Sequence, residues 1–325
     1  MFYSIRHSTR YRYSAPITEC QMEVRAQPRS EGPQRCWEFE VRSMPRTRIQ
    51  HYRDSLGNTV HHFDVPGRHS RLTITTQSLV EVESQLFIPE DLGFDAWDAI
   101  DQIAKEGDYW EMLAPSKFAA PTPLLEAFGA EIGLSRREDP LLLLRRVTRS
   151  IQNLLDYVPK STRVDSPIDE ALASRKGVCQ DFTHIMIALV RGLGIPCRYV
   201  SGYLFHRAES RDRSSADATH AWAEAYLPGL NWVGFDPTND VLVGGRHIRV
   251  AVGRDYSDVP PTRGVFRGDA ETELSVAVQV NPSEAPVLED ATGTPWLAND
   301  AEDMTALAAP SSAEINREQE QQQQQ

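Results

Sequence analysis

Cys179 stands at the start of a segment whose apolar residues recur with helical spacing. Counting back three positions from Phe182 puts Cys179 on the inward face of the first turn. Unpaired N–H groups and the positive dipole end at a helix N-terminus favour a thiolate over a thiol. Cys179 is therefore a candidate nucleophile, although on this feature alone a buried structural cysteine is the commoner explanation. The apolar positions of the predicted helix are Phe182, Ile185, Met186, Leu189, Val190 and Leu193, and Gly192 or Gly194 can end it.

A hairpin is predicted downstream, with strands over residues 220–227 and 231–236. Successive side chains of a strand point to opposite faces, which places His220 on one face of the first strand and Asp236 on one face of the second. The hairpin brings these two residues to the same end. They share a face if the loop holds an odd number of residues, and Pro228–Leu230 is a candidate three-residue loop.

A cysteine, a histidine and a carboxylate form a constellation suited to acyl transfer. We therefore predict a triad with Cys179 as nucleophile, His220 as base and Asp236 as the group that orients the imidazole. The thiolate attacks a carbonyl carbon, and the imidazolium then protonates the leaving amine. The backbone N–H of Cys179 is expected in the oxyanion hole. Tyr157 and Gln180 are weak candidates for its second donor.

The other histidines are weaker candidates for chemistry. His184 lies five positions after Cys179, about 140° around a helix, and is not expected to be the base. His61 and His62 point to opposite faces of a strand, and with His69 they are expected to be surface imidazoles rather than metal ligands. Because the calcium pattern Asp-x-Asp-x-Asp-Gly is also missing from the sequence, we expect neither a metal nor a cofactor.

The regions that must position these residues differ in pattern. Residues 1–88 contain short alternating or β-branched runs between turn residues, which predicts an antiparallel β-sandwich domain. Residues 89–123 are irregular and end in a Pro-rich stretch, as expected of a linker. Over residues 124–282 we expect the catalytic core, whose first strong helix begins with Asp139 as N-cap and Pro140 in the first turn.

Composition limits the function classes. The 325 residues suggest about two domains, and 40% hydrophobic and 25% charged residues are ordinary for a globular protein. Of the net charge of −12, the predicted disordered tail at 283–325, which is acidic and ends in five Gln, carries −8. The remainder is close to neutral, which argues against a nucleic-acid partner. The longest apolar run, Ile185–Val190, is far too short to span a membrane, and residues 1–10 lead into no secretory signal. We therefore expect a cytoplasmic protein.

The four cysteines form no Cys-x-x-Cys pair, so a zinc site or thioredoxin-like motif has little support. Cys20 and Cys36 are expected to be reduced and partly buried. Cys197, at the start of a predicted strand, is most simply a small core residue.

Four segments together resemble the transglutaminase-like core of bacterial proteins named as cysteine proteases. They are Gly177–Phe182, Gly194–Tyr203, His220–Trp222 and Phe235–Thr238. The opening strands are similar to the N-terminal β domain of that family, and Gly253–Pro261 resembles its closing segment. Cys197 stands where a smaller residue is expected, and the tail is an addition.

The resemblance covers roughly residues 1–280 and implies an α+β fold. In it, a papain-like core packs the helix that carries Cys179 on an antiparallel sheet. It assigns Cys179, His220 and Asp236 to the triad of an amide or peptide bond hydrolase that forms a thioester acyl-enzyme. Two alternatives stay open: an amine-accepting acyltransferase of transglutaminase type, and a non-catalytic binding module with a vestigial triad. The expected partner is a peptide or protein amide substrate, and the oligomeric state is undetermined.

Overall fold

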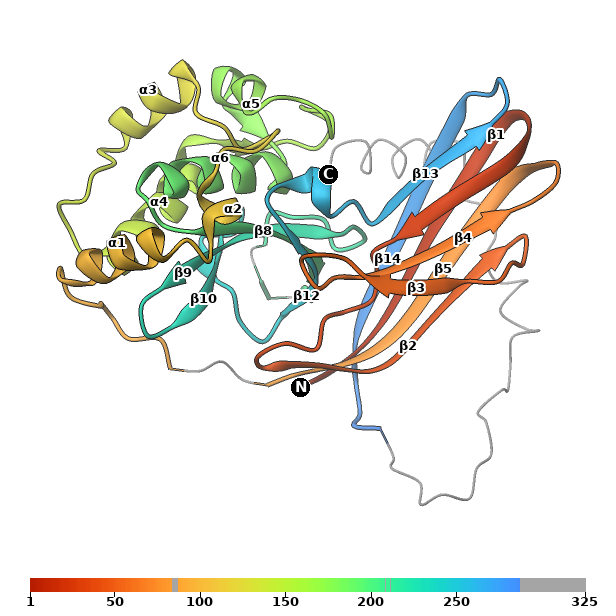
Figure 1. Cartoon of the computed structure of the whole chain (residues 1–325), viewed down its shortest axis with the longest axis horizontal. Helices are drawn as coiled ribbons and strands as arrows, with labels where there is room; N and C mark the ends of the chain where they lie inside the picture. The colour runs from red at the N-terminus through yellow and green to blue at the C-terminus, as the bar shows by residue number, and fades with distance from the viewer. Residues whose placement is uncertain (84–86, 208, 211, 287–325) are drawn as a thin grey trace.

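A computed structural model describes residues 1–83, 87–207, 209–210 and 212–286. Figure 1 shows the helices and a small sheet at one end of the molecule, and long strands projecting from them at the other. The chain is a mixed α and β protein with an antiparallel N-terminal sheet, as predicted. In the described part of the chain, none of the helices combines the length and hydrophobicity needed to cross a bilayer.

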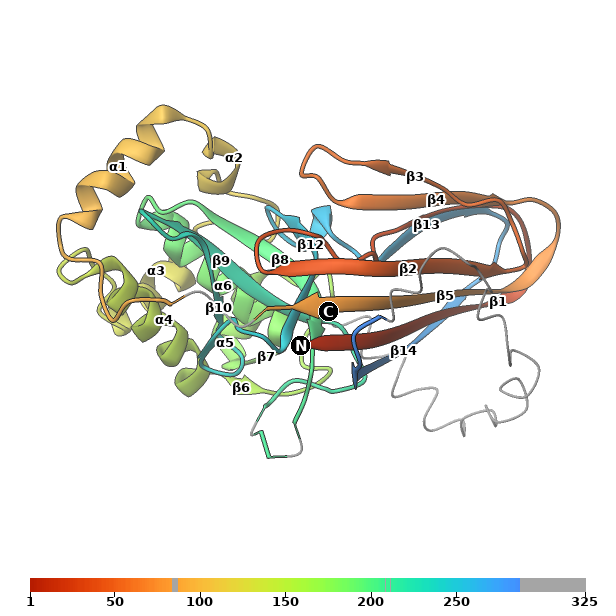
Figure 2. The same ribbon diagram turned by 90° about the horizontal axis from the view of Figure 1, so that it is seen from below.

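The N-terminal part is organised around one long strand, β1. The first half of β1 pairs with β5 and β14, and its second half pairs with β4 and β13, all antiparallel. β2 extends the first group beyond β5, and β3 extends the second beyond β4. Figure 2 shows β3 and β4 lying apart from β2 and β5. The strands are β1 (Phe2–Val24), β2 (Gln34–Met44), β3 (Gln50–Arg53), β4 (Thr59–Val65), β5 (His69–Val82), β13 (Thr262–Arg267) and β14 (Thr272–Ser283).

A hydrophobic core joins the two groups of strands. Ile17 and Met22 of β1 pack with Phe63 of β4 and with Leu72 and Ile74 of β5, and all five side chains are buried. The two groups therefore enclose a common interior, as the sandwich prediction requires.

The described chain returns to this part at its C-terminal end, which differs from the expected division of the sequence. Residues 262–282, assigned above to the catalytic core, lie in β13 and β14 on the edges of β1. The physical reason is that β1 would otherwise expose a long row of unpaired backbone groups. The predicted tail from 283 onward begins with Ser283 still in β14, and from residue 287 it lies outside the described residues.

The second part contains a five-stranded antiparallel sheet in the order β11-β10-β9-β8-β12. The helix α6 packs on β8 and β9, and α3, α4 and α5 also contact α6. The elements are α1 (Ala96–Glu106), α2 (Trp110–Leu113), α3 (Pro123–Glu131), α4 (Pro140–Leu154), β6 (Asp156–Tyr157), α5 (Ile168–Ser174), β7 (Lys176–Gly177), α6 (Cys179–Gly192), β8 (Cys197–Leu204), β9 (His220–Leu227), β10 (Asn231–Asp236), β11 (Val241–Leu242), β12 (His247–Gly253) and η1 (Tyr256–Asp258).

Two predicted helices form as expected. Asp139 caps α4, where its carboxylate accepts a hydrogen bond from the N–H of Leu142 at 2.9 Å, and Pro140 occupies the first turn. The helix α6 starts at Cys179 and buries the predicted apolar face. Its other faces are buried too, because elements pack on α6 from several sides.

The segment 89–123 is not irregular throughout, because it contains α1, α2 and the first residue of α3. Trp97 and Ile100 form the buried face of α1, and Gly107, in the left-handed conformation, ends it. The short apolar pattern and the neighbouring prolines conceal these helices in the sequence.

Side-chain amides from the N-terminal part bind the outer edge of β12. Gln34 accepts from the N–H of Arg249 and donates to its carbonyl, both at 2.7 Å. Asn58 makes the same two bonds to Val252, at 2.8 and 2.9 Å. Each amide satisfies one residue of the edge as a neighbouring strand would.

Candidate active site

Cys179 is the first residue of α6, and 3% of it is exposed. The carboxylate of Asp181 accepts hydrogen bonds from the N–H of Val178 at 2.8 Å and from the hydroxyl of Thr162 at 2.6 Å. A Cβ atom at Gly177 would lie 3.0 Å from this carboxylate, so glycine leaves room for it. Burial raises the pKa of Asp181 to about 6 in spite of these bonds.

The predicted hairpin forms with the predicted three-residue loop. Leu227 pairs with Asn231, and the register continues to the pair of Ala223 with Phe235. The next position along the strand, Asp236, therefore stands opposite Trp222. It lies diagonally across from His220, on the same face of the sheet. The odd number of loop residues produces this arrangement, as the sequence predicted.

The structure joins His220 to Asp236 at the end of this hairpin. Nε2 of His220 lies 2.8 Å from Oδ2 of Asp236, and both side chains are fully buried. Asn239 donates its side-chain amide to the same Oδ2 at 2.7 Å, and the backbone N–H groups of Thr238 and Asn239 donate to Oδ1. Burial raises the pKa of Asp236, but the two imidazoles of His220 and His247 outweigh burial and hold it well below its usual range.

The remaining ring nitrogen of His220 is left for Cys179. In the described residues Nδ1 of His220 is buried and has no hydrogen-bond partner of ordinary geometry. Burial lowers the pKa of His220, but the Asp236 carboxylate and, after it, Cys179 raise the pKa to about 10. Asp236 and Cys179 thus both lie close enough to His220 to raise its pKa.

A second histidine, His247, also contacts this carboxylate. Its Nε2 lies 3.2 Å from Oδ2 of Asp236, and its ring packs edge-on against Trp222 at 5.3 Å between centroids. The sequence analysis missed His247, because it begins β12, a strand that pairs with β8 and not with the hairpin strand β10. The one available signal was a histidine at the start of a predictable strand, which is weak.

His220, Asp236 and His247 offer ligand atoms within 4.8 Å of one another. Both imidazole nitrogens lie at hydrogen-bond distance from the same oxygen, Oδ2 of Asp236. Hydrogen bonds from these nitrogens to Oδ2 account for both contacts.

Tyr157 and Gln180, the candidates for a second oxyanion donor, both lie near Cys179. Tyr157 is in β6, which pairs with β7 just before Cys179, and burial followed by Cys179 raises its pKa. The side-chain amide of Gln180 donates to the carbonyl of Val164 at 3.0 Å, and its oxygen is buried with no partner of ordinary geometry among the residues that the structure describes. Their participation in catalysis stays a prediction.

His184 packs away from the triad as a neutral core residue. Its Nε2 accepts from the N–H of Tyr256 at 3.2 Å, its ring stacks on Phe118, and burial lowers its pKa to about 3. His61 corrects an expectation, because it is buried rather than at the surface. Its ring contacts His51 of the neighbouring strand β3 and Phe39 of β2, which faces β4 across the interior.

The other three cysteines are free thiols, as is Cys179. Burial raises the pKa of all three thiols, to about 11 for Cys36 and to about 12 for Cys197. These three thiols are therefore poor nucleophiles at neutral pH.

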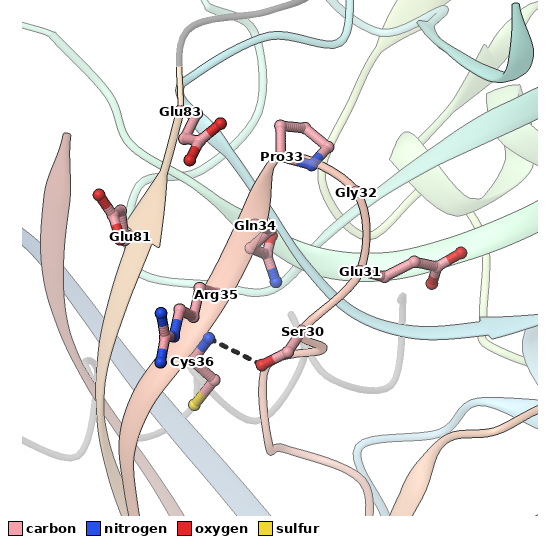
Figure 3. Close-up of a pocket in the computed structure, with 9 residues that line it drawn as sticks. All are labelled: Ser30, Glu31, Gly32, Pro33, Gln34, Arg35, Cys36, Glu81 and Glu83. Carbon is pink, nitrogen blue, oxygen red and sulfur yellow. Dashed lines mark hydrogen bonds between the residues drawn. The ribbon is translucent and has the colours of Figure 1, made fainter.

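A hollow near the start of β2 is a different feature. Figure 3 shows it lined by the segment from Ser30 to Cys36 and by Glu81 and Glu83, with the N–H of Cys36 donating to Ser30. The three predicted triad residues are not in its lining.

Comparisons with known proteins identify the family of the chain. Residues 130–237 match the family described as the transglutaminase-like superfamily, and residues 3–81 match the bacterial transglutaminase-like N-terminal region. An uncharacterized protein of Mycobacterium leprae is 35% identical over 275 residues, which are 84% of this chain and 96% of that protein.

Two further proteins are similar over different lengths. A protein-glutamine gamma-glutamyltransferase of Pseudomonas aeruginosa is 30% identical over 95 residues, only 13% of its own length. A solved structure named "a Putative Cysteine Protease" from Cytophaga hutchinsonii has the same fold, with a TM-score of 0.67 and 22% identity over 88% of this chain and 92% of that one. The chain belongs to the transglutaminase-like superfamily and carries the bacterial transglutaminase-like N-terminal region.

Proposed function

We propose that this protein is a cysteine-dependent hydrolase of peptide or amide bonds. One observation carries the proposal: the buried imidazole of His220 contacts the Asp236 carboxylate at 2.8 Å, and Cys179 lies close enough to this ring to raise its pKa. A pKa of about 10 keeps the imidazole protonated at neutral pH. In the proposed mechanism Cys179 reacts as the thiolate, the form that attacks carbonyl carbon.

The acylation step follows from this pair. The Cys179 thiolate forms a bond to the carbonyl carbon of the substrate, and the carbonyl oxygen becomes an oxyanion. The backbone N–H of Cys179 at the start of α6 is our candidate donor to it. The C–N bond then breaks while His220 gives its proton to the departing amine, which leaves a thioester on Cys179 and a neutral imidazole.

Water completes the cycle. Neutral His220 accepts a proton from water, and the resulting hydroxide adds to the thioester carbonyl. Collapse of the second tetrahedral intermediate releases the carboxylic acid and restores the thiolate and the imidazolium. Asp236 keeps the ring oriented and stabilises its positive charge throughout, without accepting the proton.

The test measures the amine released from a panel of peptide amides. Wild-type protein is expected to release amine, and Cys179→Ala is expected to lose this activity. Cys36→Ala is the matched control, because Cys36 is a half-buried thiol of the N-terminal part. Equal release by wild type and Cys179→Ala would contradict the proposal.

A second candidate, amine-accepting acyl transfer, is favoured by the local similarity to the Pseudomonas transglutaminase. In this reaction an amine replaces water as the acceptor of the same thioester. Incubation with a glutamine-containing protein and a labelled primary amine separates the two. Incorporation of the label that depends on Cys179 supports transfer, whereas release of ammonia without incorporation supports hydrolysis. If neither occurs and Cys179 reacts with iodoacetamide no faster than Cys36, a binding module with a vestigial triad is the better description.

A further inference from the structure

The carboxylate of Asp236 has an unusual number of donors for a group that orients one imidazole. Its Oδ2 receives three side-chain donors, from His220 at 2.8 Å, Asn239 at 2.7 Å and His247 at 3.2 Å. All three side chains reach the same oxygen from different segments of the chain. The proposed acyl chemistry needs one of them, His220. The function of the second imidazole is therefore open.

The hydrogen bonds of His247 fix which nitrogen carries its proton. The N–H of Gly244 donates to Nδ1 of His247 at 3.3 Å, so Nδ1 is an acceptor. The proton then resides on Nε2, the nitrogen that faces Asp236. Burial, together with the neighbouring His220 and Arg246, lowers the pKa of His247 although Asp236 raises it, so the ring stays neutral. His247 is thus a neutral donor beside a charged imidazole.

His247 is held firmly by the elements around it. The residue pairs with Leu204 at the start of β12, and its ring lies against the fully buried Trp222. The hydroxyl of Tyr3 donates to the carbonyl of Gly245 at 2.8 Å, which ties the turn before β12 to β1. Because β12, its neighbour β8 and the turn before β12 fix the position of His247, its Nε2–H group restricts the orientation of the Asp236 carboxylate.

We propose that His247 is a positioning residue, which fixes the Asp236 carboxylate so that Oδ2 faces Nε2 of His220 and Nδ1 of His220 faces Cys179. The inference rests on the triad of the proposed function. Without His247, Oδ2 keeps Asn239 and His220, and Oδ1 keeps the N–H groups of Thr238 and Asn239, but the carboxylate loses its donor on the side of β12. The carboxylate can then tilt about the bonds that remain, and the imidazole moves with it.

The reaction of Cys179 with iodoacetamide tests this inference without any substrate. Mass spectrometry at pH 6.5 follows the modified peptide in wild type, His247→Leu and His247→Gln. The leucine variant keeps the bulk but removes the donor, and we expect the rate to fall about tenfold, as the loss of one hydrogen bond to a charged group predicts. The Nε2 amide of glutamine can restore the donor, and we expect its rate to stay within about threefold of wild type.

His7→Leu is the matched control, because His7, like His247, is a buried imidazole that makes a hydrogen bond. Its partner is the hydroxyl of Tyr203, at 2.9 Å. We expect its alkylation rate to equal that of wild type. Equal rates for His247→Leu and wild type would overturn the inference. So would equal slowing of His247→Leu, His247→Gln and His7→Leu, because a general loss of packing would then explain the effect.

NMR of the wild-type protein labelled with ¹⁵N-histidine gives a second measurement that needs neither variants nor activity. We expect His247 as the neutral tautomer with its proton on Nε2, and His220 doubly protonated. A protonated His247, or one with its proton on Nδ1, would overturn the inference. If these spectra and rates are as expected and no amide is cleaved, the proposed hydrolysis fails while the positioning role stands.

Discussion

The contact between Asn58 and β12 predicts a large loss of stability in Asn58→Ala. The Asn58 side chain is fully buried and makes four hydrogen bonds, two of them to the backbone of Val252. Alanine would leave the N–H and the carbonyl of Val252 without these partners, and Val252 is itself buried. Each buried, unsatisfied backbone group costs ~1–3 kcal/mol, so we expect the free energy of unfolding to fall by about 4 kcal/mol.

Gln34→Ala perturbs the same edge at a different residue. Gln34 is also buried and binds both backbone groups of Arg249, but it lies at the other end of β12. Hydrogen–deuterium exchange resolves the two sites. In Asn58→Ala the amide of Val252 is expected to lose its protection while that of Arg249 keeps it, and Gln34→Ala is expected to reverse the pattern.

The controls are Asn153→Ala and Gln77→Ala, because both side chains are exposed. Chemical denaturation should place both within about 0.5 kcal/mol of wild type. If Asn58→Ala lost less than about 1 kcal/mol and the amide of Val252 stayed protected, water or a rearranged loop would be satisfying the edge, and the reasoning would be refuted.

Three further outcomes follow from individual contacts. Glu224 is fully buried between Arg249 and Arg198, which lower its pKa to about 2 in spite of burial. Glu224→Gln should therefore lower the free energy of unfolding by about 3 kcal/mol at pH 7. Because the pKa is lowered on folding, this advantage of the wild type should shrink as pH falls from 5 towards 2, as urea denaturation at several pH values can show. A Cβ atom at Gly202 would lie 2.5 Å from the ring of Trp222 and would clash with the backbone oxygen of Ile248, so Gly202→Ala should lower the free energy of unfolding by more than about 2 kcal/mol. Gly229→Ala should lower the free energy of unfolding by only about 1 kcal/mol, because a Cβ atom there meets no neighbour and only the positive φ of 74° disfavours alanine. Calorimetry compares the two variants, and equal losses for Gly202→Ala and Gly229→Ala would contradict the steric argument. Since the pKa of His220 is about 10, its imidazole should stay doubly protonated from pH 6 to 9, as ¹⁵N NMR can show, whereas the alkylation rate of Cys36, with a pKa of about 11, should rise about tenfold per pH unit. Loss of a ring proton from His220 within this pH range would contradict the raised pKa.

The parts of the site that local sequence determines were predictable. The start of α6 at Cys179 follows from apolar spacing, and the facing of His220 and Asp236 follows from strand alternation and a three-residue loop. In each case the deciding interaction spans fewer than about 20 residues along the chain. The caps of α4, Asp139 and Pro140, belong to the same class.

Interactions between distant segments were not predictable from one sequence. The strands β13 and β14 have ordinary alternation, and nothing in it specifies β1, more than 200 residues away, as their partner. The contact of His247 with Asp236 has the same origin, because it depends on the place of β12 beside β8. Register between separate strands is set by packing and edge pairing in the folded protein, which a single pattern does not contain.

The strand β12 shows why these distant contacts bear on the candidate site. It is an edge strand of the sheet that carries His220, and an uncovered edge would exchange its hydrogen bonds with water or with another chain. Gln34 and Asn58 cover it from the N-terminal part, Tyr3 fixes the turn before it, and the N–H of Val278 in β14 donates to the carbonyl of Asp217, just before His220, at 2.9 Å. The orientation of His247, and through it that of Asp236, therefore depends on strands from both ends of the described chain. A cut at residue 88 would separate Tyr3, Gln34 and Asn58 from the segment around β12 to which they bind, so the N-terminal strands act as part of the support of the site.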